Sequence, residues 1–249
     1  MQRQELLNYL NDTLCADSIH DYCPNGLQIE GTQTVQKITT GVTASQALID
    51  AAIANGSDTI IVHHGYFWKG ESPVLTGMKA KRIKALLVND INLFGYHLPL
   101  DVHPELGNNA QLAKLLGITV THNLAVKPDG VVKAGLVETS TLGAMAQTIT
   151  QQLQREPLVI GELNKPIETI AWCTGGGQGY IEAAAEAGMD LFISGEVSEQ
   201  TVHFARENDI AFIAAGHHAT ERYGVKALGE HLAQQFALDV CFIDIDNPA

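Results

Sequence analysis

The stretch Thr59-Ile60-Ile61-Val62-His63-His64-Gly65 is the part of the sequence that most strongly indicates the fold. Its apolar, β-branched run predicts a buried strand, and ligands bind at the carboxyl ends of strands in open α/β sheets. Neighbouring strand residues point to opposite faces, so both imidazoles reach one site only if the chain turns there. Gly65 would permit that turn. We therefore expect His63 and His64 to belong to one site.

A repeat at a spacing of 132 residues extends this interpretation along the chain. The shift aligns Val35 with Ile167, Ile38 with Ile170, Gly56 with Gly188, Asp58 with Asp190, Ile60 with Phe192, and His63-His64 with Gly195-Glu196. Further on, Asn89-Asp90-Ile91 resembles Asn208-Asp209-Ile210, and His97 and Asp101 stand against His217 and Glu221. A correspondence through strand, helix, glycine stop and strand indicates a duplicated α/β unit, with chance similarity of alanine-rich helices as the alternative.

The hydrophobic periodicity predicts the elements that this duplication requires. Helices are expected at about 6–14, 44–55, 79–89, 141–154 and 224–236, and strands at about 27–30, 35–42, 59–62, 91–95, 131–137, 157–160 and 239–245. We place the first repeat at residues 1–124, with 222–249 packing back on it, and the second repeat at residues 125–221.

Composition limits the class of protein. The net charge is −13, with 15 basic against 28 acidic residues, which disfavours sequence-independent binding to a nucleic-acid backbone. The four cysteines are widely spaced, so they suggest neither a disulfide framework nor a thiolate zinc site. We find no signal peptide and no apolar run of membrane-spanning length, and we expect a cytoplasmic protein.

Three polar clusters follow predicted strands and carry the chemistry: His63-His64, His97 to Asp101, and His217 to Glu221. Imidazole and carboxylate ligands together suit zinc, iron, manganese, nickel or cobalt better than calcium or magnesium. A first helical turn would place residues 217 and 221 on one face. Because the ligands outnumber what one tetrahedral zinc needs, we predict a two-metal site.

Several other residues allow two interpretations. Glu196 is either an outer partner of the metal site or a solvated side chain. The glycine-rich run Cys173 to Gly179 could hold an anion on its backbone amides, although a tight turn explains it equally simply. Tyr66, Phe67 and Trp68 could stack on a planar substrate or pack against protein. The remaining cluster and helix histidines, His103, His203, His218 and His231, are expected to have structural roles.

These motifs together resemble the Nif-three-like family, whose members are often labelled GTP cyclohydrolase 1 type 2 homologues, and in particular its short bacterial members. The matching motifs are Asp21-Tyr22-Cys23-Pro24-Asn25-Gly26-Leu27-Gln28, Gly41 to Ser45, His63-His64-Gly65, His97 to Asp101, Thr174 to Gly177, Gly195-Glu196 and Gly216 to Glu221. The resemblance implies two intertwined, duplicated α/β/α repeats with mixed sheets, a dinuclear metal site between them, and a ring-shaped homohexamer. It implies the ligands His63, His64, Asp101, His217 and Glu221, while His97 is kept as an acid or base.

The leading functional hypothesis is a metal-dependent hydrolase that acts on a small substrate, nucleotide-like compounds among the candidates, through a metal-bridging hydroxide. It requires two divalent transition ions per subunit, of iron, manganese, zinc or nickel. The alternatives are a noncatalytic metal-storage or scaffold ring, or a ring involved in nucleic-acid or DNA-damage processes. The helix with Lys79, Lys81, Arg82 and Lys84 would have to provide the basic surface for the last alternative.

Overall fold

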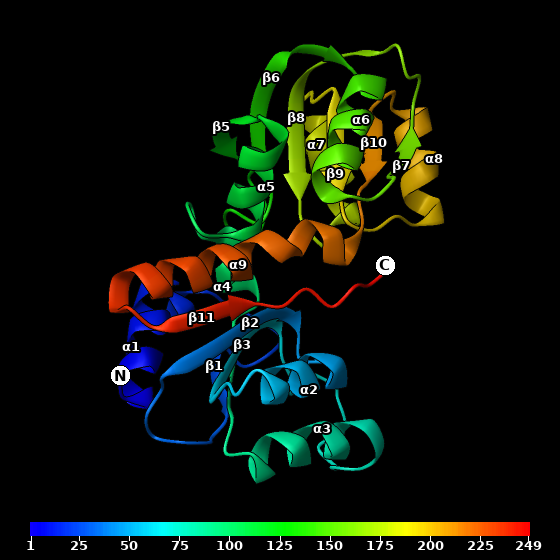
Figure 1. Ribbon diagram of the computed structural model, residues 1–249. Coiled ribbons are helices and arrows are strands. Elements are labelled where there is room, and N and C mark those ends of the chain that lie inside the picture. Colours follow the sequence, from blue (N-terminus) through cyan, green and yellow to red (C-terminus); the bar gives the residue numbers. More distant parts are fainter. The chain divides into compact units, whose positions relative to one another are not determined.

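A computed structural model describes residues 1–249, and the chain divides into two compact units. The first unit contains Met1–Leu100 and Gly224–Asp246, and the second contains Asp101–Tyr223 and Asn247–Ala249. Each unit has its own sheet and its own helices (Figure 1). No helix combines the length and the apolar character that crossing a membrane demands.

The first unit is built on a five-stranded sheet in the order β1-β4-β3-β2-β11. Its strands are β1 (Gly26–Ile29), β2 (Lys37–Thr43), β3 (Thr59–His64), β4 (Asn92–Gly95) and β11 (Asp239–Phe242), and only β1 runs antiparallel to its neighbour. Its helices are α1 (Arg3–Thr13), α2 (Gln46–Ala54), α3 (Gly77–Val88) and most of α9 (His217–Phe236), with a short 3-10 helix at Ala16–Ser18. Helices α2 and α3 pack on one face, where Leu48, Ile83 and Leu86 join Ile60 and Val62 in a buried cluster.

The second unit is built on a six-stranded sheet in the order β5-β6-β8-β9-β10-β7. Its strands are β5 (Thr119–Asn123), β6 (Lys133–Thr141), β7 (Leu158–Ile160), β8 (Pro166–Cys173), β9 (Leu191–Ser194) and β10 (Ala211–Ala214). Its helices are α5 (Asn108–Leu116), α6 (Leu142–Leu153), α7 (Ile181–Glu186) and α8 (Glu199–Glu207), with a 3-10 helix at Gln178–Tyr180, and α4 (Leu98–Val102) spans the division between the units. Helices α5 and α6 share one buried cluster with Trp172 and Ile193.

The strand register confirms the duplication. Ile38 of β2 pairs with Thr59 of β3, and the residues 132 positions later, Ile170 of β8 and Leu191 of β9, pair in the same way. In both sheets the next parallel strand, β4 or β10, carries a short antiparallel edge strand, β1 or β7. A shared register is a demanding match, because a slip by one residue would exchange the two faces of a strand.

Equivalent side chains support the backbone at equivalent points of the two units. Asp58 accepts hydrogen bonds from the N–H groups of residues 36 and 37, and Asp190 accepts them from those of residues 168 and 169. Asp90 and Asp209, which follow α3 and α8, both adopt left-handed φ values, of 54° and 51°. The alignment that began as a pattern of residue types is therefore also an alignment of backbone hydrogen bonds.

The structural correspondence also includes the helix before each sheet. Gln2, just before α1, forms an antiparallel bridge with Thr34, and Thr141, just before α6, pairs with Pro166, which lies 132 positions after Thr34. The predicted repeat boundaries, 1–124 and 125–221, remain a prediction about duplicated sequence. The compact units divide the chain after Leu100 instead, since α5 and β5 contact the second sheet.

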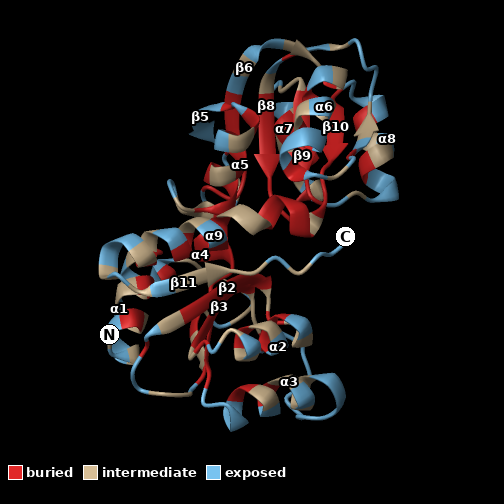
Figure 2. Cartoon of the chain, viewed as in Figure 1, coloured by how far each residue is buried: buried red, intermediate tan, exposed pale blue.

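Burial follows the sheets, and it explains which elements the sequence did not indicate. Figure 2 shows buried residues concentrated in the central strands, whereas every residue of β5 is exposed. An exposed strand has no apolar alternation, so periodicity gave no signal for β5. Helix α5 was also missed, although Leu112 and Leu116 at helical spacing and Gly117, with φ 68°, are a helix pattern and its stop.

Gly65 has a different role from the predicted one. A Cβ at Gly65 would lie 2.2 Å from Oε1 of Gln28, and the same Oε1 accepts a hydrogen bond from Tyr66 N–H. The left-handed residue of this loop is Phe67, with φ 67°. Gly65 is therefore required for the close approach of a side chain rather than for a turn.

Candidate metal centre

Three imidazoles cluster in the first unit, where β3 and β4 end. The ring centroids of His63 and His64 lie 4.5 Å apart, and that of His97 lies 5.0 Å from His63 and 5.8 Å from His64. One ring nitrogen from each of the three lies within 4.8 Å of the others. His63 and His97 are buried, so charging several of these rings together would be costly, whereas neutral imidazoles are good metal ligands.

Each of these rings is held through its Nδ1 atom. His63 Nδ1 lies 3.0 Å from the carbonyl oxygen of Tyr96, and His64 Nδ1 lies 3.1 Å from Oγ1 of Thr43. A carbonyl can only accept, so His63 donates from Nδ1 and keeps its lone pair on Nε2. Metal-binding histidines typically have such an outer partner, which fixes the orientation of the ring and its tautomer.

His97 is held by a buried carboxylate and two aromatic rings. Its Nδ1 lies 3.0 Å from Oδ1 of Asp21, whose side chain is 2 % exposed. Burial alone would raise the pKa of Asp21, but hydrogen bonds from His97, Asn25 and the Leu98 N–H lower it to about 2. The rings of Tyr22 and Trp68 each stand edge-on to His97 with centroids 5.0 Å away. Asp21 is therefore ionised in the physiological range and positions His97.

His217 and Glu221 form a second group, in the second unit. Helix α9 begins at His217, and this first turn brings Nε2 of His217 to 3.2 Å from Oε2 of Glu221, as the predicted i, i+4 spacing requires. Nδ1 of His217 lies 2.7 Å from Oε1 of Glu196. Glu196 thus contacts the candidate ligand itself, which favours the outer-partner interpretation over that of a merely solvated side chain.

The electrostatics of this second group match those of a cation site. Burial lowers the pKa of His217, but the hydrogen bond and negative charge of Glu221, followed by those of Glu196, outweigh it and raise the pKa to about 9. Two carboxylates therefore stabilise one positive charge beside them. A divalent cation would meet the same stabilising charges.

Asp101 also has its orientation fixed inside the second unit. The side chain is buried, and its Oδ1 accepts hydrogen bonds from Nδ2 of Asn108 at 2.8 Å and from Oγ1 of Thr174 at 3.3 Å. Asn108 and Thr174 were not singled out as site residues from the sequence. Their contacts with Asp101 join positions 7 and 73 residues apart, and the larger separation leaves no local pattern to detect.

The glycine-rich loop shapes this group, and two of its amides are bonded within the protein. Gly175 N–H donates to Oγ1 of Thr220, and Gly177 N–H donates to Oγ of Ser194. A Cβ at Gly175 would lie 2.0 Å from Oε1 of Glu221, and the residue has φ 63°. The loop is therefore a tight turn that leaves space for the Glu221 carboxylate.

Other polar residues that the sequence drew attention to have structural roles. His103 Nδ1 accepts from the N–H groups of residues 105 and 106, and His231 contacts the hydroxyl of Tyr9. Burial, followed by the negative charges of Asp101 and Glu221, raises the pKa of Cys173, so this thiol is poorly suited to act as a nucleophile. Tyr66 is buried and its hydroxyl donates to the carbonyl of Ala44, which excludes it from stacking on a substrate.

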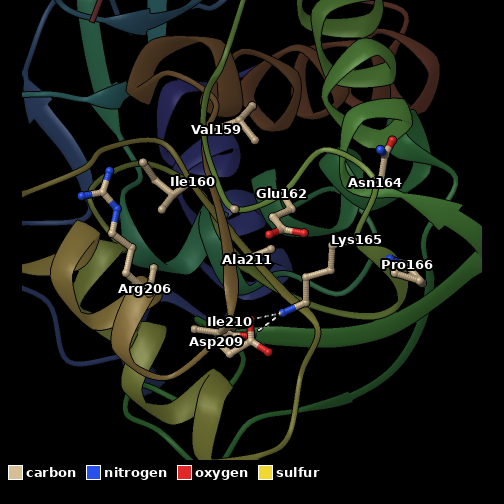
Figure 3. Close-up of a pocket in the computed structure, with 12 residues that line it drawn as sticks. Val159, Ile160, Glu162, Asn164, Lys165, Pro166, Arg206, Asp209, Ile210 and Ala211 are labelled. Carbon is tan, nitrogen blue, oxygen red and sulfur yellow. Dashed lines mark hydrogen bonds and ion pairs between the residues drawn. The ribbon is translucent and has the colours of Figure 1, made fainter.

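A further cavity of the second unit lies away from these candidate ligands. It measures about 890 Å³ and is lined by β7, the loop after it, the end of α8 and the start of β10. Figure 3 shows Glu162, Lys165 and Arg206 among its walls, with Lys165 bonded to Asp209. The cavity adjoins the amino end of β10, whereas His217 follows the carboxyl end. None of the candidate ligands lines it.

The fold and these groups define a duplicated α/β protein with a candidate His/Glu metal-binding cluster. The chain belongs to the Duf34/NIF3 (NGG1p interacting factor 3) family, whose model matches residues 1–248. It is 60 % identical over 255 residues to a protein of Haemophilus influenzae and 57 % identical over 251 residues to one of Escherichia coli K12. Both relatives are named "GTP cyclohydrolase 1 type 2 homolog", and each match covers 100 % of both chains.

Solved structures confirm the fold. The structure described as "protein ybgI, unknown function" matches with a TM-score of 0.97 and 56 % identity, and that of TTHA1606 from Thermus thermophilus with 0.90 and 37 %. Both matches cover 100 % of both chains. A protein related to NIF3 from Bacillus cereus, 17 % identical, still reaches a TM-score of 0.84. The family and the mixed α/β architecture expected from the sequence are thereby confirmed.

Proposed function

We propose that this protein binds two divalent transition-metal ions and acts as a metal-dependent hydrolase on a small substrate. The ligands in this proposal are His63 and His64 of the first unit and Asp101, His217 and Glu221 of the second. The observation that carries it is the orientation of the candidate ligands, because His63, His64 and His217 each have Nδ1 on an oxygen. Such outer contacts are typical of protein metal sites.

The chemistry of the donor set fits the ions. Imidazole nitrogens with carboxylate oxygens suit iron, manganese, zinc or nickel, and the absence of a cysteine pair disfavours a structural thiolate site. Ions of this kind would supply Lewis acidity and lower the pKa of bound water. The names of the relatives point to nucleotide-like compounds as the first substrates to screen.

His97 is the proposed acid or base. Asp21 holds Nδ1, so Nε2 is the atom that would exchange a proton with the substrate. Tyr22 and Trp68 limit the movement of the ring and shield it from water on two sides. Asp21 has the orienting role that carboxylates have toward catalytic histidines in other hydrolases.

Elemental analysis of the purified protein tests the metal assignment. We expect about two transition ions per subunit in the wild type, and loss of metal with the fold retained in Glu221→Ala and His64→Ala. Glu186→Ala and His203→Ala are matched controls, because both side chains are exposed on helices of the second unit. Full metal content in Glu221→Ala would overturn the ligand assignment.

Turnover assays distinguish the hydrolase hypothesis from the noncatalytic alternative. A panel of esters, amides and nucleotides should show metal-dependent hydrolysis that His97→Ala reduces by about a hundredfold or more, as expected for loss of a general acid or base. Metal that is bound tightly, with no turnover on the panel, would instead support a noncatalytic protein that stores metal or serves as a scaffold.

We also propose that the protein forms a homo-oligomer, with the hexameric ring of the family resemblance as the expected state. The first unit exposes large apolar side chains near α3, including Met78 at 67 % and Val88 at 69 %, which an interface could cover. Light scattering of the purified protein measures the mass directly. A monomer at micromolar concentration would contradict the proposal.

A further inference from the structure

A second group of metal-ligating side chains lies on the other side of His97, in the first unit. Asp21, Cys23 and His97 each offer one ligand atom, and these atoms lie within 4.8 Å of one another. Cys23 belongs to no Cys-x-x-Cys pair and lies 74 residues before His97 in the sequence, so only the fold brings it to His97. A thiol, a carboxylate and an imidazole form a mixed set of sulfur, oxygen and nitrogen donors.

The arrangement already has nearly the spacing that an ion needs. Nδ1 of His97 and Oδ1 of Asp21 lie 3.0 Å apart. Two ligand atoms that are each about 2 Å from a tetrahedral zinc ion are separated by about 3.3 Å, so an ion could replace the shared proton with a shift of a few tenths of an ångström. The side chains of Asp21 and His97 are 2 % and 9 % exposed, which keeps this pair out of bulk solvent.

The loop around Asp21 is rigidly held. Oδ2 of Asp21 accepts hydrogen bonds from Nδ2 of Asn25 at 3.0 Å and from the Leu98 N–H at 2.9 Å, while Oδ1 also accepts one from the Tyr22 N–H. Asn25 Oδ1 in turn accepts from the His97 N–H at 2.8 Å. The carboxylate is therefore fixed in place and ionised before any ion arrives.

A surface cavity leads to these ligands from solvent. It measures about 370 Å³, and Asp21, Cys23 and Asn25 line it together with Asp17 and His20. Asp17 and His20 are exposed, and each is a side chain of a type that binds metals. Besides Cys23, the residues that line the cavity thus include two carboxylates and one imidazole, which are groups that attract or bind a cation.

We propose that Asp21, Cys23 and His97 form a loading site, which takes a thiophilic divalent cation such as zinc or ferrous iron from solvent. His97 belongs both to this group and to the cluster with His63 and His64, through one ring. A neutral imidazole has one lone pair and binds one ion at a time, so the two groups compete for His97. In this proposal the ion bound at the loading site is then transferred to the metal centre. The site does not depend on the proposed hydrolase, whereas the passage of the ion rests on the proposed metal centre.

Cobalt titration of the metal-free, full-length protein tests the site. A Cys23 thiolate bound to Co²⁺ gives a charge-transfer absorption in the near ultraviolet, which imidazole and carboxylate ligands alone do not give. We expect the band in the wild type and in Cys15→Ser, a control that removes an exposed cysteine of the same segment. Cys23→Ser should lose the band, with at least a tenfold lower affinity of this site, about the least that loss of even an outer partner costs.

Two further outcomes keep this test distinct from that of the metal centre. Glu221→Ala should keep the charge-transfer band even if it binds less metal in total, because Glu221 is not one of the three proposed ligands of the loading site. The absorption bands of Co²⁺ bound without sulfur report filling of the metal centre. Slower growth of these bands in Cys23→Ser than in the wild type would support the loading role. A wild type without the band, or a band that persists in Cys23→Ser, would overturn the proposal.

Discussion

The two units share a scaffold but differ in the side chains at the ends of their strands. Strands β2 and β3 keep the register of β8 and β9 at a constant offset of 132 residues, and Asp58 and Asp190 hold the same backbone N–H groups. At the strand ends, His64 of the first unit corresponds to Glu196 of the second. The first unit therefore supplies imidazoles from a strand, while the second supplies a carboxylate partner there and its ligands from helices.

A position that lies beside the His64/Glu196 difference also differs between the two units. Thr43 contacts His64 in the first unit, and Gly175, which is 132 positions later, makes room for Glu221 in the second. A duplicated scaffold thus retains its backbone hydrogen bonds while the residues around the site change together. The hydrogen bonds that define the sheet are the same in both copies, so the difference in chemistry does not require a difference in fold.

Gly175→Ala should give the largest effect of the substitutions that compare the two units. The new Cβ would overlap Oε1 of Glu221, and the residue would keep an unfavourable positive φ, so we expect a loss of about 3 kcal/mol of unfolding free energy. Bound metal should fall with it. Thr43→Ala, at the equivalent position, loses only one polar contact and should cost about 1 kcal/mol or less.

Urea unfolding and elemental analysis of both variants measure this difference. Equal costs at the two positions would show that the glycine loop is not fitted to Glu221. If Gly175→Ala is as stable as the wild type and binds the full amount of metal, the close approach of Glu221 does not explain the glycine at this position.

Asp21, which holds His97 after β4, and His217, which follows β10, should contribute to stability in opposite parts of the pH range. Asp21, the partner of His97, has a folded pKa of about 2, below its usual 3.8, so its contribution is present above about pH 4 and is lost as the pH falls through about 2. This lowering of the Asp21 pKa corresponds to about 2 kcal/mol of unfolding free energy. His217 has a folded pKa of about 9, above its usual 6.5, so its contribution is present below 6.5 and is lost as the pH rises through 9.

Unfolding of the metal-free protein as a function of pH measures both contributions. Asp21→Asn should reduce stability by about 2 kcal/mol near neutral pH and lose its effect near pH 2. Glu196→Gln should reduce the contribution of His217 below about pH 6.5 and lose its effect as the pH rises through about 9. An Asp21→Asn penalty that is unchanged at acid pH would contradict the ion pair with His97.

Gly56→Ala and Gly188→Ala should give the smallest difference between the two units. These glycines end α2 and α7 with φ values of 70° and 71°, and a Cβ at either position would meet nothing within 4 Å. Only the left-handed backbone is unfavourable, so each substitution should cost about 1 kcal/mol. Thermal unfolding can compare them, and costs that differ by more than about twofold would indicate that the two copies of the scaffold are not energetically equivalent.

Local patterns predicted most of the architecture because they report burial and turn chemistry. Helices α2, α3 and α6 and strands β1, β3, β4 and β7 were expected within a few residues of their observed bounds. Helix α9 begins at His217, earlier than the expected 224, because its first turn carries polar site residues that break the apolar pattern. Strand β5 is exposed along its whole length, so it had no pattern to detect.

The sequence by itself determined the duplication, the family and the types of candidate ligand, because these depend on residue identity and spacing along the chain. The tertiary structure decided which partner orients each of these side chains. Asp21 orients His97, Tyr96 orients His63, Thr174 orients Asp101, and Glu196 orients His217. These pairs are separated by between 21 and 76 residues. Contacts over such separations arise from the pairing of strands, and hydrophobic periodicity carries no information about them.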